Sequence, residues 1–479
     1  MSDGNTTEPQ SVDAETPSVE SFLEQGHRAA KAEKYDDAAE AFGNAVEIAP
    51  ENALARYNLA LAQQQLGDLE GAVATYLRTI QIDPNLIEAY INLGHLYSQL
   101  NLDEESLEVF QRAIELDASN DELFVALGET YTNLGFYEDA IQAFRQAEII
   151  SPDNIHAKDS LHDVRERLNS QTVRISELEN QLDQDPSDMD RYAEVIGAYL
   201  ESRRYQDALT STTRMAELFP EEPAVYETIA MVYEMLGDID SAAASWERVT
   251  QMDPEDIDAW EKLGDWRAEQ GLMEEAILAY RQAIELDPES PAARFRLAEA
   301  LMEDANYTEA ITLYQQLSQD KFALADDDEL KTDAYVGLAE AQNAAGLFEE
   351  ALQSCTTLLD EYPDDDLALY QRAAAFDGLG RFDEAIDSYI SSLENNPLNA
   401  DTYNDLADTY IKTGDIDNAI EMAEMAIALM PEMDVAYETL GQALRTAGRV
   451  EEAEKAEQQA RDLQSALADE DDDEGTTKE

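Results

Sequence analysis

The sequence predicts an all-α protein in which paired helices stack into a solenoid. Three observations lead to this prediction. A stretch of 34 residues, Ile257 to Ser290, recurs along most of the chain, each of its halves carries an apolar stripe at helical spacing, and proline and small residues recur at fixed positions of the repeat. Paired amphipathic helices that cannot bury their faces alone must stack on their neighbours.

The reference repeat reads IDAWEKLGDWRAEQGLMEEAILAYRQAIELDPES. Its first half places Trp260 and Gly264 on one helical face, and its second half does the same for Ala276 and Tyr280. Gly271 lies between the halves, where a residue in the left-handed conformation can end the first helix. Pro288, which lies 31 positions after the start of the repeat, ends the second helix, because a helix cannot continue through proline.

The same frame covers the chain with thirteen repeats, which start at residues 19, 53, 87, 121, 155, 189, 223, 257, 291, 332, 366, 400 and 434. Ten of the fourteen prolines occupy the position of Pro288. Eleven of the thirteen repeats have alanine at the position of Ala276, and the exceptions are Ser106 and Arg174. A small residue there lets the two helices of a repeat approach closely.

These residues resemble the tetratricopeptide repeat family, and the resemblance extends over residues 19 to 467. It implies a right-handed superhelix of about 12 to 13 repeats, a concave groove that binds peptide segments or helices of other proteins, and no catalysis. The family's basic clamp for a terminal carboxylate is not seen. Lys262 and Arg296, in adjacent repeats, are the nearest approach to it.

Departures from the repeat predict how the chain is divided. Residues 155–188 have His162, Arg174 and Gln181 at positions that are small elsewhere, so we expect a degenerate repeat or a spacer helix. Polar or acidic segments without periodicity predict disorder at both ends. The predicted segments are a disordered lead (1–18), an array of four repeats (19–154), the degenerate repeat or spacer (155–188), an array of eight repeats (189–467) with an insertion (325–331) and a capping last helix, and a disordered acidic tail (468–479).

Composition narrows the class of partner. The chain has 31 Lys and Arg against 106 Asp and Glu, a formal net charge of −75, yet 44% of its residues are hydrophobic, which is enough for a continuous core. The negative electrostatic field of such a protein repels nucleic acids and anionic membranes, so we expect protein partners, basic ones among them. The polar N-terminal sequence has no apolar run, which predicts a cytoplasmic protein without a membrane anchor.

The residues predict no catalytic, cofactor or metal site. Four histidines are too few and too scattered for a metal centre, and Cys355, the only cysteine, is expected in the core. No phosphate-binding glycine loop or nucleophile motif occurs, and the repeats leave no segment of about 100 residues for a catalytic domain.

Of the 37 aromatic residues, 29 fall at four repeat positions that face neighbouring helices. Tyr57, Phe295 and Tyr370 lie outside these positions and share one that lines the concave groove in the resembled family. A large side chain at this position is expected to face the groove.

Two groups of groove residues are candidate contact sites. A neutral patch, rich in amides and aliphatic side chains that could grip an extended peptide, comprises Tyr57, Asn58, Leu61, Gln64, Ile91, Asn92, His95 and Ser98. An acidic groove, which would favour basic partners, comprises Asp258, Glu261, Asp265, Glu299, Glu340, Asp405 and Asp408. Two alternatives to a binding scaffold stay open: a self-assembling structural solenoid, and an accessory or regulatory subunit of a larger enzyme or secretion complex.

Overall fold

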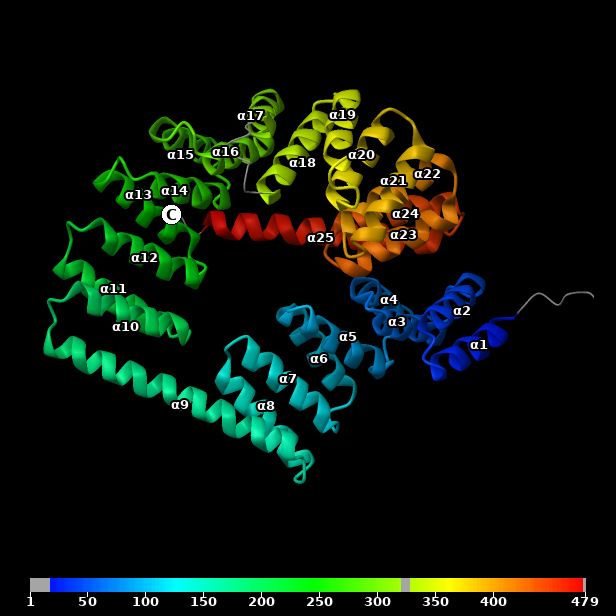
Figure 1. Cartoon of the computed structure of the whole chain (residues 1–479), viewed down its shortest axis with the longest axis horizontal. Helices are drawn as coiled ribbons and strands as arrows, with labels where there is room; N and C mark the ends of the chain where they lie inside the picture. The colour runs from blue at the N-terminus through cyan, green and yellow to red at the C-terminus, as the bar shows by residue number, and fades with distance from the viewer. Residues whose placement is uncertain (1–17, 320–327, 477–479) are drawn as a thin grey trace, which may run out of the picture. The chain divides into compact units, whose positions relative to one another are not determined.

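The computed structural model describes residues 18–319 and 328–476, which form 25 α-helices and no strand. The chain divides into two compact parts, an N-terminal part (1–119) and a C-terminal part (120–479). The helices of the N-terminal part are α1 (Val19–Lys31), α2 (Tyr35–Ile48), α3 (Ala53–Leu66), α4 (Leu69–Ile82), α5 (Ile87–Gln99) and α6 (Asp103–Leu116) (Figure 1).

The C-terminal part contains nineteen helices among its described residues. They are α7 (Asp121–Asn133), α8 (Tyr137–Ile150), α9 (Ile155–Gln184), α10 (Met189–Glu201), α11 (Tyr205–Leu218), α12 (Pro223–Leu236), α13 (Ile239–Met252), α14 (Ile257–Glu269), α15 (Met273–Leu286), α16 (Pro291–Glu303), α17 (Tyr307–Gln319), α18 (Asp328–Ala344), α19 (Phe348–Leu359), α20 (Asp366–Gly378), α21 (Phe382–Asn395), α22 (Ala400–Thr413), α23 (Ile416–Leu429), α24 (Asp434–Thr446) and α25 (Val450–Thr476). The predicted all-α solenoid fold is confirmed.

The helices follow the predicted repeat closely. Twelve of the thirteen predicted repeat starts are the first residue of a helix, and the exception is 332, which lies inside α18. The turn inside each helix pair also falls at one repeat position, where the backbone has a positive φ. These turn residues are Glu33, Gly67, Asn101, Gly135, Arg203, Gly237, Gly271, Ala305, Gly346, Gly380, Gly414 and Gly448. Glycine adopts this conformation without the steric cost that a Cβ imposes.

Close contact between the two helices of a repeat depends on its small residues. Ala276 is fully buried, as are the alanines at the equivalent positions and Ser106. At Gly264 an added Cβ would come within 2.4 Å of the ring of Tyr280. The small side chain therefore makes room for the aromatic ring of the second helix, which is the physical basis of the sequence pattern.

Helix α9 is the exception to the pairing, because it runs unbroken for 30 residues (Figure 1). Arg174 stands where other repeats have a buried alanine, and its exposed guanidinium pairs with Glu201 over 2.5 Å. Folding the segment back into a pair would bury that charge without compensation, which is unfavourable. The helix instead continues straight through the position where other repeats turn.

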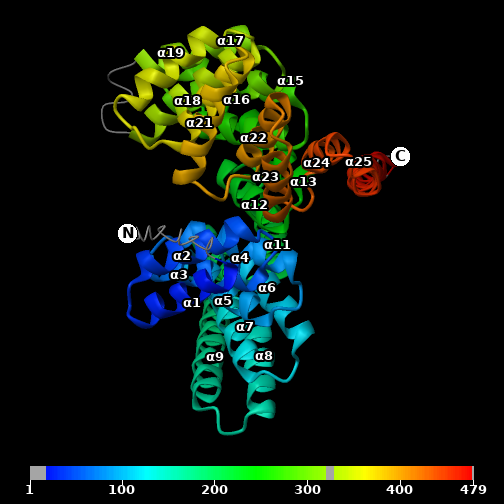
Figure 2. The ribbon, with the colours of Figure 1, turned by 90° about the vertical axis from the view of Figure 1, so that its right-hand side faces the viewer.

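The two ends of α9 belong to different hydrophobic clusters. Leu161 and Val164 pack with Phe144 of α8, and α8 and this half of α9 lie side by side (Figure 2). Ile175 and Leu182 pack with residues of α10 to α12. The helix thus joins the core before it to the core after it, and whether it divides two functional arrays stays a prediction.

Three further predictions concern the chain's ends and its insertion. The disordered lead lies outside the described residues except for Ser18, whose hydroxyl accepts from the Ser21 N–H as the N-cap of α1. Residues 328–331 of the insertion form the start of α18, and 325–327 lie outside the described residues. The acidic tail was predicted to begin at residue 468; α25 continues to Thr476, and 477–479 lie outside the described residues. Cys355 is buried in α19, as predicted.

Candidate functional site

Tyr57, Phe295 and Tyr370, the three aromatic residues outside the usual positions, behave alike in the structure. Each ring packs against the tyrosine of the second helix in its own repeat, which supports the groove side of the helix pair. The ring centroids are 6.0, 5.7 and 5.9 Å apart in the pairs Tyr57–Tyr76, Phe295–Tyr314 and Tyr370–Tyr389.

Two of these three aromatic residues also bond to the following repeat. Tyr57 accepts a hydrogen bond from Asn92 over 3.0 Å, and Tyr370 donates one to Asp405 over 2.8 Å. Phe295 has no hydroxyl to make such a bond. The equivalent position of the following repeat is Gly337, which has no side chain to receive one.

A cavity of about 740 Å³ opens where the hydroxyl and its partner are both missing. It lies between α16, α17 and α18, and we call it the α16–α18 cavity. Its lining residues are Ala292, Phe295, Arg296, Glu299, Met302, Glu303, Tyr314, Glu329, Leu330, Asp333, Val336, Gly337 and Glu340. This volume lies within the range of about 300–1,000 Å³ that is usual for ligand pockets.

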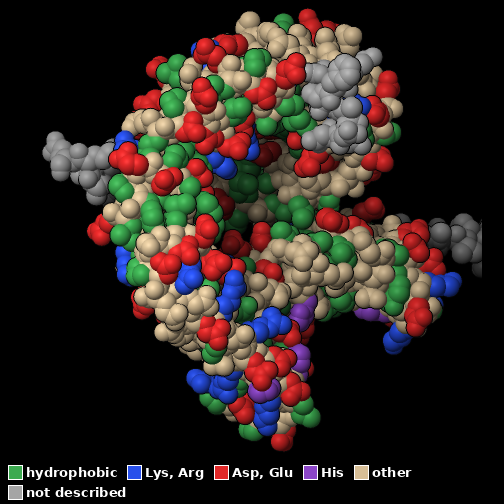
Figure 3. All heavy atoms as spheres, turned by 60° about the vertical axis from the view of Figure 1, so that its left-hand side comes forward, with side chains coloured by type: hydrophobic (Ala, Val, Ile, Leu, Met, Phe, Trp, Pro, Cys, Tyr) green, Lys and Arg blue, Asp and Glu red, His purple; other side chains and the backbone are tan. Residues whose placement is uncertain are grey.

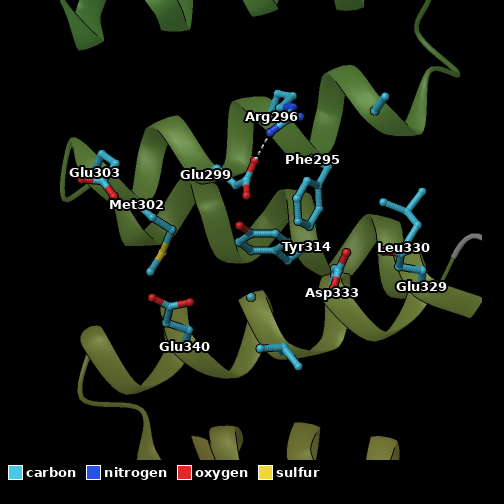
Figure 4. Close-up of a pocket in the computed structure, with 13 residues that line it drawn as sticks. Phe295, Arg296, Glu299, Met302, Glu303, Tyr314, Glu329, Leu330, Asp333 and Glu340 are labelled. Carbon is cyan, nitrogen blue, oxygen red and sulfur yellow. Dashed lines mark hydrogen bonds and ion pairs between the residues drawn. The ribbon is translucent and has the colours of Figure 1, made fainter. Parts of the chain in front are cut away.

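The walls of the α16–α18 cavity combine apolar and acidic groups (Figure 4). The rings of Phe295 and Tyr314 lie beside each other, and the carboxylates of Glu299, Asp333 and Glu340 surround them from α16 and α18. Among the described residues, five carboxylates line the cavity against one cation, Arg296. An extended cationic side chain fits such a lining, because its methylenes can contact the rings while its charge meets a carboxylate.

Burial raises the pKa of two of these carboxylates. Burial raises the pKa of Glu299, although the Arg296 guanidinium beside it acts in the opposite direction. Burial also raises the pKa of Glu340, and the negative charge of Glu303 adds to the effect. A cation bound between these groups would favour their charged forms, and would thus offset both the cost of burying the carboxylates and their mutual repulsion.

A smaller cavity of about 310 Å³ lies between α14, α15 and α16, and Arg296 lines it too. We call it the α14–α16 cavity. Asp265 and Glu269 line it from α14, and Arg296, Glu299 and Glu303 line it together with the larger cavity. The Tyr280 hydroxyl donates to Asp265 over 2.8 Å, which holds that carboxylate in place.

The seven residues predicted for the acidic groove are distributed as follows. Asp265, Glu299 and Glu340 line one or both cavities, while Asp258 and Glu261 lie on α14 outside them. Asp405 and Asp408 lie on α22, away from the cavities, where Asp405 accepts from Tyr370 and Asp408 pairs with Lys412. On the face drawn in Figure 3, acidic side chains are spread over the surface with Lys and Arg side chains between them.

The neutral patch lies in the N-terminal part, and several of its polar groups bond to neighbouring protein groups. The Asn58 side chain is only 9% exposed and donates to the Leu54 carbonyl. Gln64 accepts from the Tyr76 hydroxyl over 3.3 Å, and the Ser98 hydroxyl lies 2.8 Å from that of Ser106.

The remaining members of the neutral patch are more accessible. The His95 side chain is exposed beside the Phe110 ring, with 5.2 Å between the ring centroids. Leu61, Ile91 and Asn92 are half-buried. The patch therefore presents an aliphatic surface with fewer unused hydrogen-bonding groups than its sequence indicates.

Sequence reasoning missed several residues of the α16–α18 cavity. Tyr314 occupies a repeat position that usually faces the core. Met302 shares the repeat position of Gln64 and Ser98, but it was not among the predicted groove residues, and neither were Glu303 and Asp333. The sequence contained one signal for this cavity: Phe295 is an aromatic residue at a groove position that has no hydroxyl. Its combination with Gly337 in the next repeat could have located the cavity.

The described residues give no sign of a metal site or a membrane segment. Within 18–319 and 328–476, no three His, Cys, Asp or Glu side chains come together in an arrangement that could hold a metal ion. Among the same residues, no helix combines the length and apolar character that crossing a bilayer requires.

Comparison with known families agrees with the repeat architecture. Tetratricopeptide repeat models match residues 23–87, 228–291, 321–366, 370–434 and 404–468, others match 87–120 and 121–154, and a further one matches 267–323. The chain belongs to the tetratricopeptide repeat family. This family defines a class of protein-interaction scaffolds, and its fold is known as a non-enzymatic one.

Solved structures with a similar fold include three tetratricopeptide or related helical proteins. The APC/C hetero-tetramer Cut9–Hcn1 shares 16% identity over 89% of this chain and 96% of that one, with a TM-score of 0.39. Yeast Tom70 shares 15% identity over 90% and 96%, with a TM-score of 0.38. A tetratricopeptide repeat protein from Parabacteroides merdae shares 17% over 59% and 98%, with a TM-score of 0.30. No curated protein matches the chain.

Proposed function

We propose that the protein is a non-enzymatic, cytoplasmic scaffold that holds basic, extended segments of partner proteins in the groove of its C-terminal part. The observation that carries the proposal is the α16–α18 cavity, whose described lining residues include five carboxylates, one cation and an aromatic wall. An extended peptide presents alternate side chains to the same face, so a basic segment could place one cationic side chain in each cavity.

Charge complementarity supports basic partners in two ways. The net charge of −75 attracts positively charged segments from a distance and speeds their encounter with the protein. Glu303 and Glu340 form no ion pair with any described residue, so a bound cation would meet carboxylates that are not already neutralised. Long-range attraction alone would not select one groove, whereas the cavity provides a defined position.

The test is a binding measurement with the full chain and a labelled peptide that has arginine at every second position and alanine between. The variant Glu299→Gln/Glu340→Gln should bind this peptide about tenfold more weakly, because two partly buried carboxylates lose their charge. The matched control is Glu274→Gln/Glu350→Gln, which removes two exposed carboxylates from the starts of α15 and α19. This control should change the affinity by less than about twofold.

Two results would contradict the proposal. Equal losses in the two double variants would mean that the peptide senses only the overall field of the protein. Failure of the wild-type chain to bind the arginine peptide, or equal binding of a peptide with glutamine in place of arginine, would exclude a groove for basic segments.

The neutral patch is a proposed second contact for the same class of partner. Asn92 and the half-buried Leu61 and Ile91 lie on neighbouring helices of the N-terminal part, where they could hold an uncharged stretch of peptide. Asn92→Ala should weaken a partner that uses this patch, whereas a partner held only by the acidic cavities should be unaffected.

A further inference from the structure

Arg296 is the only cation among the described residues that line the two cavities, and it lies between them. Its guanidinium donates to Glu299 on the same helix over 3.3 Å (Figure 4). It also lies 3.8 Å from Asp265 on α14. The Arg296 side chain thus lines both cavities, as Glu299 and Glu303 do, and it is shared by two carboxylates.

These interactions are weak enough to be exchanged. The Arg296 side chain is 54% exposed, and ion pairs at such exposure contribute little because water and salt screen them. A flexible arginine can move between two carboxylates on adjacent helices without losing its charge partner. The Asp265 carboxylate is held by the Tyr280 hydroxyl, so it stays in position to receive the guanidinium.

A cation that enters the α16–α18 cavity competes with Arg296 for Glu299. The entering side chain gains contact with Phe295 and Met302 and lies near Glu340, which has no ion pair with any described residue. Arg296 can then remain paired with Asp265. After the exchange each carboxylate keeps or gains a cation, so the binding of a second cation is favourable.

We propose that Arg296 is the specificity-determining residue of this groove: a partner's arginine or lysine side chain replaces the Arg296 guanidinium at Glu299, and Asp265 retains Arg296. This inference rests on the proposed function. Arg296 acts as an internal competitor that excludes neutral side chains and weakly held cations, because only a ligand that gains both charge and apolar contacts displaces it.

The first test compares Arg296→Gln with Arg281→Gln in the full chain. Arg281 pairs with Glu309 over 2.8 Å outside both cavities, so its replacement is a matched loss of one partly exposed cation. The arginine peptide should bind Arg296→Gln about fivefold more tightly than the wild type, because a competing ion pair is removed. The Arg281→Gln variant should gain less than about twofold.

A second measurement examines the role of Asp265. Asp265→Asn should weaken peptide binding to the wild type, because Arg296 then has no second carboxylate and stays on Glu299. In the Arg296→Gln background the same change should have almost no effect, since no arginine needs to be relocated. Equal weakening in both backgrounds would show that Asp265 contacts the peptide itself and would overturn the exchange.

The outcomes separate this inference from the function on which it rests. If neither the wild type nor Arg296→Gln binds the arginine peptide, the basic-segment groove itself is wrong. If the wild type binds in a way that depends on Glu299 and Glu340, but Arg296→Gln gains no more than Arg281→Gln, only the role of Arg296 fails. Weaker binding by Arg296→Gln would show that Arg296 contacts an acidic group of the ligand instead.

Discussion

Tyr370 donates its hydroxyl to Asp405, 35 residues further along the chain, over 2.8 Å. Tyr57 and Asn92 make a bond with the same sequence separation in the N-terminal part. In both places the bond joins the groove helices of neighbouring repeats. These tyrosines therefore close the groove at the position where Phe295 leaves a cavity.

We expect Tyr370→Phe to lower the free energy of unfolding by about 1–2 kcal/mol, because Asp405 loses a hydrogen bond in a buried setting. Burial already raises the pKa of Asp405, and the Tyr370 hydroxyl acts against that rise, so the pKa should increase further in the variant. Urea unfolding measures the first effect. Tyr437→Phe is the control, because that hydroxyl bonds to no described residue, and an equal loss there would contradict this account.

The raised pKa of Glu340 makes stability depend on pH. Since the folded state holds the proton more tightly than the unfolded state, the contribution of Glu340 is complete below its ordinary pKa of 4.5 and is lost as pH rises through the folded value. Glu340→Gln should therefore be more stable than the wild type at neutral pH, and the difference should shrink toward pH 4.5. The comparison uses urea midpoints across this range.

Other acidic groups do not disturb that comparison. Carboxylates whose pKa is lowered, such as Glu384 beside Arg381, contribute stability with the opposite pH dependence, but they are present in both proteins and cancel. The large net charge is also nearly the same in both proteins, so its effect on the pH dependence of stability cancels as well. Parallel stability curves for the wild type and Glu340→Gln would contradict the role assigned to Glu340.

Two glycines in helices should respond oppositely to alanine. At Gly264 the new Cβ would meet the buried Tyr280 ring at 2.4 Å, so Gly264→Ala should destabilise the protein by about 1–3 kcal/mol. At Gly197 in α10 nothing lies within 4 Å of the added carbon, so Gly197→Ala should stabilise the protein by about 0.5–1 kcal/mol. Thermal unfolding measures the stability of both variants. Stability changes of the same sign would contradict the argument that the Tyr280 ring leaves no room for a Cβ at Gly264.

Glu234 accepts hydrogen bonds from two tryptophans, since the indole N–H groups of Trp246 and Trp266 each lie 2.7 Å from the same carboxylate oxygen. Glu234→Leu should cost about 2–3 kcal/mol, because both part-buried donors lose their acceptor. The tryptophan emission should also shift. Glu234→Gln keeps an acceptor and should lose less than half as much, so similar losses in the two variants would show that the indoles find other acceptors.

The sequence alone determined the repeat, its phase and its helix pairs. Periodic apolar positions and phased prolines report which face each helix buries and where it ends, and these are local properties of the chain. For that reason the predicted starts at residues such as 53 and 257 coincide with helix starts. The unusual residue Arg174 likewise marked the segment that forms α9 as different from its neighbours.

Only the tertiary structure decided which groove residues form a site. The repeat position of Asn58 predicted that it lies in the groove, but its surroundings in the folded protein bury it. The α16–α18 cavity is lined by Phe295, Tyr314 and Gly337, which lie on three different helices, and the Tyr314 ring lies where a Cβ of Gly337 would be. A cavity forms where side chains from separate repeats do not fill the space between them. A periodic sequence pattern does not show how well these side chains fit together.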